Sequence, residues 1–152
     1  MSASEDIRSG GFAWPPVVTV YNHDQARDAA EAAMRHGTGL TLLSADSAAD
    51  AVGVGWMATL GRLIREEFPA LTVYTILDCG AAGGRAMAAL RAEIDAIVFT
   101  GGEKSTLALA DQADDLGKGL LPERPESLDF LTLPDDPERC NIAVSDWFEL
   151  TT

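Results

Sequence analysis

Short apolar runs recur along the chain and alternate with segments in which apolar residues return every three or four positions. The runs occupy residues 17–21, 40–43, 71–77 and 96–99. An apolar run without in/out alternation is typical of a strand that is covered on both faces, as in a parallel sheet. Leu120 and Leu121 add a short fifth strand at best.

The segments between the runs have the spacing of amphipathic helices. Helices are predicted over residues 25–35, 56–68 and 103–116, and around residues 87–94. Gly37 stands where a glycine ends a helix in the left-handed conformation. In the helix over 103–116 we expect Leu107, Ala110 and Ala113 to face the core. Residues 45–55 are small and weakly patterned, which indicates a loop with at most one helical turn.

The alternation of strands and helices predicts one α/β domain over residues 15–121. We expect a three-layer, Rossmann-like or flavodoxin-like architecture, with an open, mostly parallel sheet of four or five strands and helices on both faces. A half-barrel completed by a partner is the alternative. Residues 1–14 are predicted to be a flexible N-terminus, and residues 122–152 a proline-rich, acidic C-terminal arm.

The acidic composition narrows the classes of partner. The chain has 24 acidic and 11 basic side chains, a net charge of −13. Such a surface repels phosphate backbones and no local basic patch offsets it, so we expect no nucleic-acid binding. No apolar stretch approaches the ~20 residues of a membrane helix, and the first residues lack the basic and apolar parts of a secretion signal. We therefore expect a cytoplasmic protein that does not bind membranes.

Two cysteines, Cys79 and Cys140, and two histidines have no metal-type spacing, so neither a metal nor a cofactor is expected. The C-terminal arm has two short apolar segments, residues 128–133 and 141–145, followed by Trp147. They favour an edge hairpin or an ordered arm in which Trp147 is at least partly buried, on its own domain or across a homodimer, and we expect the homodimer. A solvated acidic tail is the other interpretation.

Polar residues and glycines follow the strands, where parallel sheets bind ligands outside the carboxyl ends of their strands. Backbone N–H groups of glycine turns could hold an anion at the helix starts. The predicted ligand-binding residues are Asn22, Ser44, Asp78, Gly80, Gly83, Arg85, Gly101 and Gly102. The leading hypothesis is a domain that binds a small anionic metabolite or a protein partner at this edge. Such residues also serve simply to turn and cap short loops.

One spacing favours an enzyme instead. Cys79 and Arg85 form C-x5-R between a strand and a helix, as in cysteine-dependent phosphatases, where a thiolate lies below backbone N–H groups and an arginine. Asp78 adds negative charge beside the thiol, and Ala86 stands where those loops usually have Ser or Thr. The glycine turn from Gly80 differs from the dinucleotide fingerprint G-x-G-x-x-G, and TGGEKST differs from a Walker phosphate loop.

Residues 16–37 and 64–102 resemble strand–helix–strand units of TIM-barrel aldolases that cleave keto-deoxy sugar phosphates. The resemblance implies repeated βα units. Those aldolases need a Schiff-base lysine at the end of a later strand and a glutamate near the end of the second. Here the second strand ends in LLSAD, and Lys104, one of two lysines, lies at a helix start. The resemblance therefore implies no catalytic residue in this chain.

Overall fold

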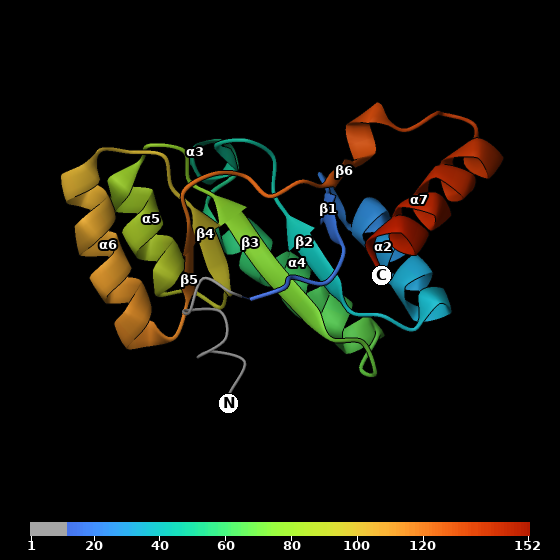
Figure 1. Cartoon of the computed structure of the whole chain (residues 1–152), viewed down its shortest axis with the longest axis horizontal. Helices are drawn as coiled ribbons and strands as arrows, with labels where there is room; N and C mark the ends of the chain where they lie inside the picture. Colours follow the sequence, from blue (N-terminus) through green and yellow to red (C-terminus); the bar gives the residue numbers. More distant parts are fainter. Residues whose placement is uncertain (1–11) are drawn as a thin grey trace.

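The computed structural model describes residues 12–152, which fold around an open sheet of six strands in the order β5-β4-β3-β2-β1-β6 (Figure 1). The strands are β1 (Val17–Thr19), β2 (Leu40–Leu43), β3 (Val73–Asp78), β4 (Ala96–Val98), β5 (Gly119–Leu121) and β6 (Leu128–Asp129). All neighbouring strands are parallel. The α/β class with an open parallel sheet is confirmed. Six strands replace the expected four or five, because the arm supplies β6.

The helices agree with the sequence pattern except where the pattern is weak. They are α2 (His23–His36), α3 (Ala48–Ala51), α4 (Val54–Glu67), α5 (Gly83–Leu90), α6 (Glu103–Leu116), the short 3₁₀ helix η1 (Phe130–Thr132) and α7 (Pro137–Thr151). Gly37 ends α2 with φ of 65°, as expected. Within residues 45–55, the four-residue α3 is the single helical turn that the sequence allowed, and α4 begins at Val54, two residues before its predicted start at Trp56. Leu107 of α6 is 63% exposed, so its assignment to the core was wrong, and Leu109 is buried instead.

The helices form one layer. Contacts link them in the order α6, α5, α4, α2, α7, and their buried residues share one core with Val18, Leu42 and Leu77 of the sheet. The expected placement of helices on both faces is therefore corrected: among the described residues, the second face of the sheet carries no helix. The reason is topological. Strands β1 to β5 are added in one direction, so right-handed crossovers all lie on the same face.

Extended chain covers the second face. Leu43, Ile76 and Val98 form a smaller core there, against which Trp14 packs. The rings of Phe12, Trp14 and Tyr74 meet edge to face, with centroids 4.7–5.6 Å apart. Residues 122–127, called the strap below, run from β5 at one edge of the sheet past the ends of the central strands to β6 at the other edge (Figure 1).

The C-terminal arm belongs to the same core as the rest of the chain. Phe130, Val144 and Phe148 are buried in the main core, and Phe148 stacks on His36 of α2 with ring centroids 6.0 Å apart. Trp147 is half-buried. The predicted edge hairpin is wrong for residues 141–145, which lie in α7. Pro137 at the helix start and the Asp136 side chain, which accepts a hydrogen bond from the Arg139 N–H, favour this helix.

Of the predicted flexible N-terminus, residues 1–11 lie outside the described residues. Phe12 and Trp14 are half-buried. Across residues 12–152, each helix is too short or too polar to span a bilayer.

Candidate functional site

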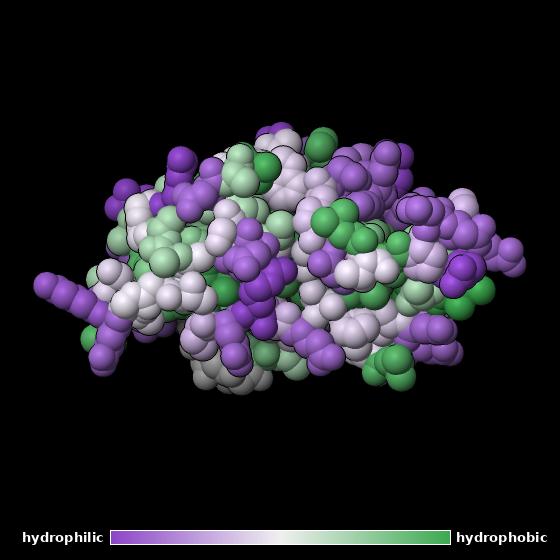
Figure 2. Space-filling view, turned by 90° about the horizontal axis from the view of Figure 1, so that it is seen from above, coloured by the Kyte–Doolittle hydropathy of each residue, from purple (hydrophilic) through white to green (hydrophobic). Residues whose placement is uncertain are grey.

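The carboxyl ends of the strands meet at one edge of the sheet, which therefore gathers the loops that lead into α2, α3, α5 and α6. Figure 2 looks down on this edge and shows a band of hydrophilic residues across its middle, between patches of hydrophobic ones. The predicted ligand-binding residues all lie in or beside these loops. They fall into two groups. Residues of the first group make hydrogen bonds or close contacts within the protein, and residues of the second group have free space around them.

Asp78, at the end of β3, belongs to the first group. Its side chain is 2% exposed. One carboxylate oxygen accepts the N–H of Gly80 at 2.8 Å, and the other accepts a guanidinium N–H of Arg124 at 2.8 Å. A buried carboxylate must be paired or hydrogen-bonded, and both conditions are met here. Asp78 therefore holds the strap to the sheet.

Arg124 was not among the predicted site residues, yet it joins three strands. Its Nη1 also donates to the Ser44 carbonyl at 2.9 Å, and its Nη2 donates to the hydroxyl of Thr19 at 3.2 Å. The signal available in the sequence was a basic residue within the acidic segment PERPE. That signal does not say which carboxylate the arginine reaches, because Asp78 is 46 residues away.

Ser44, Gly80 and Asn22 also serve the fold. The Ser44 hydroxyl accepts the N–H of Asp78 at 2.9 Å and donates to the Ala45 carbonyl at 3.1 Å. Gly80 has φ of 54°, and a Cβ there would lie 2.5 Å from the Ser47 hydroxyl oxygen, so a side chain is excluded. Asn22 caps α2 by accepting the Gln25 N–H at 2.9 Å.

Gly83, Arg85 and Gly102 form the open group. A Cβ built on Gly83 or Gly102 meets no atom within 4 Å, so their surroundings are free. The Arg85 side chain is 55% exposed, and its Nε lies 3.7 Å from a carboxylate oxygen of Asp50. The loop that ends in Gly83 and the loop that ends in Gly102 are joined, because the Thr100 N–H donates to the Gly80 carbonyl at 2.7 Å.

Gly101 has a structural reason to be glycine. A Cβ on it would lie 2.3 Å from the ring of Phe99. Phe99 is buried in the main core, so its ring cannot move aside at low cost. The residue therefore fixes the loop between β4 and α6 and offers a ligand only its backbone.

Cys79 does not have the exposed position that the phosphatase hypothesis requires. It is fully buried in the main core, and its Sγ points to the Leu77 carbonyl at 3.7 Å. Burial, followed by the charges of Asp78 and Asp50, raises the pKa of this thiol to about 12. A nucleophilic cysteine needs a thiolate and access to substrate. The geometry gives Cys79 neither, while Arg85 lies on the surface.

A second polar cluster fastens β6 to β1. The Tyr21 hydroxyl donates to a carboxylate oxygen of Asp129 at 2.9 Å, and the hydroxyls of Thr19 and Ser127 lie 2.7 Å apart. Burial, and then the hydrogen bond and charge of Asp129, raise the pKa of Tyr21 to about 12. The tyrosine thus remains a neutral donor across the physiological pH range.

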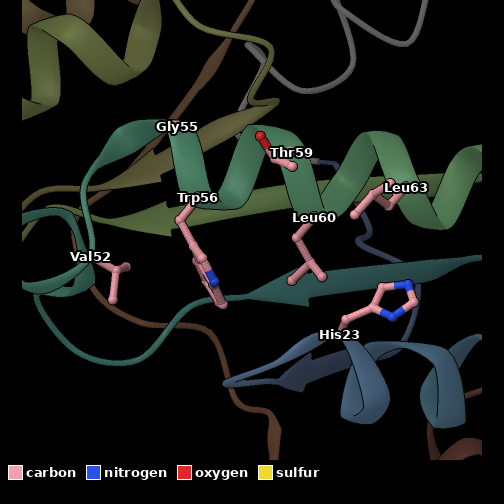
Figure 3. A pocket seen from close by; sticks show the side chains of 7 residues that line it. All are labelled: His23, Val52, Gly55, Trp56, Thr59, Leu60 and Leu63. Carbon is pink, nitrogen blue, oxygen red and sulfur yellow. The ribbon is translucent and has the colours of Figure 1, made fainter.

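One hollow lies away from the predicted residues. It measures 420 Å³ and opens between α4 and the start of α2, where Trp56, Leu60 and His23 extend into it while Thr59 points away (Figure 3). His23 is fixed at its rim by Glu67, which also accepts a hydrogen bond from Arg27 at 2.9 Å. This hollow is mostly apolar and has no counterpart in the sequence pattern.

Metal-type clusters of three or more His, Cys, Asp or Glu side chains do not occur within residues 12–152. No model of a known protein family matches the chain, and no curated protein matches its sequence.

Proposed function

We propose that the chain binds a small anionic metabolite at the carboxyl edge of its sheet, between the N-termini of α5 and α6. The observation that carries the proposal is that these two contacting helices both begin without a side-chain cap, at Ala82 and Gly102. The first N–H groups of a helix have no partner within it, so they remain available to an anion.

The other helices that start at this edge differ. Asn22 already caps α2. Helices α3 and α4 also begin without a side-chain cap, at Ser47 and Gly53. However, α3 has only four residues with the acidic Asp50 in its first turn, and no basic side chain lies in the first turn of α4. In α5 the first turn includes Arg85, whose contact with Asp50 joins two exposed groups. Such surface pairs contribute little free energy, so the guanidinium can turn to a ligand.

The free space around three glycines and the net charge of the chain both favour a small ligand. Space around Gly83, Gly84 and Gly102 lets a phosphate or carboxylate reach the backbone. The net charge of −13 repels anions at a distance, and Glu103 in the first turn of α6 adds to this locally. A small ligand held by short-range hydrogen bonds fits these conditions better than a polyanion.

Amide chemical shifts test the proposal. Titration with inorganic phosphate, at constant ionic strength set with chloride, is expected to shift the amides at the starts of α5 and α6 in a saturable way. Arg85→Ala should weaken binding roughly tenfold, as expected for the loss of a charge-assisted hydrogen bond. Arg91→Ala is the matched control, because Arg91 is exposed at the opposite end of α5. Shifts that do not saturate, or equal weakening in both variants, would reject the site.

A further inference from the structure

Beneath the strap, three strands present acceptors to one point. The Arg124 guanidinium binds there to the Asp78 carboxylate, the Ser44 carbonyl and the Thr19 hydroxyl, at 2.8, 2.9 and 3.2 Å. These acceptors come from the ends of β3, β2 and β1, which are neighbours in the sheet. They form a receptor with one negative charge and three acceptors, which suits the several N–H donors of a guanidinium group.

The receptor is held in place by bonds other than those to Arg124. The Gly80 N–H fixes one oxygen of Asp78, and the Asp78 N–H is fixed by the Ser44 hydroxyl. Gly80 is itself packed against Ser47 with no room for a side chain. The carboxylate therefore keeps its orientation when the arginine is removed.

The strap, in contrast, is lightly held. Residues 122–127 contain no helix or strand, and Glu123 and Glu126 are exposed. The strand that follows, β6, has two residues and, within residues 12–152, pairs with β1 alone. Beyond Arg124, Ser127 and Asp129 tie this region to Thr19 and Tyr21 through side-chain hydrogen bonds. Leu128 and Phe130, which follow the strap, pack in the main core, so a displacement confined to residues 122–127 leaves the strands and helices in place.

We propose that Arg124 occupies, as an internal substitute, a binding site for a guanidinium or primary ammonium group of a ligand. When the strap moves away, the Asp78 carboxylate loses its cationic partner while the Gly80 N–H still binds one of its oxygens, so the site favours another cation. A cation from solution then replaces Arg124 and holds the edge open. This inference rests on Asp78, Ser44 and Thr19, and not on the helix starts that the anion proposal uses.

Removal of the internal arginine tests the receptor. Arg124→Ala is expected to bind methylguanidinium chloride saturably, with at least a tenfold higher affinity than the wild type, and to rise in melting temperature as it does so. Sodium chloride at the same concentration is the ionic control, and Arg91→Ala is the control variant. Arg124→Ala/Asp78→Asn should lose the binding. No saturable binding by Arg124→Ala overturns the proposal. Should this variant be unfolded in buffer, the proposal requires that methylguanidinium restores its folded spectrum.

The wild type tests the displacement of the strap. The side-chain ¹⁵N resonances of Arg124, assigned by their loss in Arg124→Lys, report a guanidinium held in a fixed position. Titration with methylguanidinium is expected to replace them with those of a mobile arginine, while the amides of β2 and β3 stay dispersed. Resonances that persist until the whole protein unfolds would show that the contact only fastens the fold, and would overturn the proposal.

Discussion

Most of the predicted site residues at the carboxyl edge of the sheet make contacts that stabilise the fold. The sequence correctly predicts polar and glycine residues there, but it does not predict their partners. Asp78 could be read as a ligand-binding carboxylate until Arg124, far along the chain, is seen to pair with it. Gly101 makes room for the ring of Phe99, and Asn22 caps a helix. The local turn explains why a polar residue or glycine stands at each position. The role of that residue depends on contacts with distant segments of the chain.

Cys79 gives a prediction at this scale. Its thiol has a pKa raised from 9.0 to about 12 by burial and by Asp78. Below about pH 9 the thiol is protonated in both the folded and the unfolded state. As the pH rises from about 9 towards 12, the thiol ionises in the unfolded state first, so the free energy of unfolding falls. The free energy of unfolding, measured with urea at pH 8 to 11, should fall less steeply in Cys79→Ala than in the wild type. Tyr21 contributes equally in both, and parallel curves would contradict the prediction.

At the scale of elements, local pattern and tertiary context contribute differently. The bounds of α6 match the predicted 103–116, because spacing and Gly117 determine them locally. The single helix layer and α7 were not foreseen, and the sixth strand was expected only as part of an edge hairpin. They depend on the direction in which strands are added and on the return of the arm to β1, which involve pairings such as Val18 with Leu128. The spacing of hydrophobic residues along the sequence does not indicate which strands pair with each other.

The docking of α7 on α2 can be measured through Phe148, whose side chain is fully buried and stacks on His36. Phe148→Ala should lower the free energy of unfolding by about 3–5 kcal/mol, the usual cost of removing a buried aromatic ring. Leu150→Ala, on the same helix but 83% exposed, should change it by less than about 0.5 kcal/mol. Chemical denaturation of both variants makes the comparison. Equal effects would mean that α7 does not pack as described.

At the scale of the whole molecule, one face of the sheet is covered by helices and the other by extended chain, and the arm completes both. It contributes α7 to the helix layer and the strap to the opposite face. The expected homodimer stays a prediction, since the arm packs on its own domain. Sedimentation of the full chain would decide it.

Truncation after Leu121 removes the strap, β6 and α7 together. It leaves the buried Asp78 carboxylate without its cation and uncovers the apolar side of α2, so we expect a loss of several kcal/mol and a large drop in melting temperature. Calorimetry of the truncated and full chains measures it. An unchanged melting temperature would mean that the arm contributes nothing to the core.

The place of β6 in the sheet has a consequence for synthesis on the ribosome. Strand β1 is synthesised before the other described strands, yet its outer neighbour follows more than a hundred positions later. During translation, β1 therefore has an unpaired edge exposed to other nascent chains, and such edges favour aggregation. Closing so long a separation also delays the final step of folding relative to the local βα units. A chaperone that binds the emerging chain would protect the protein most during this interval.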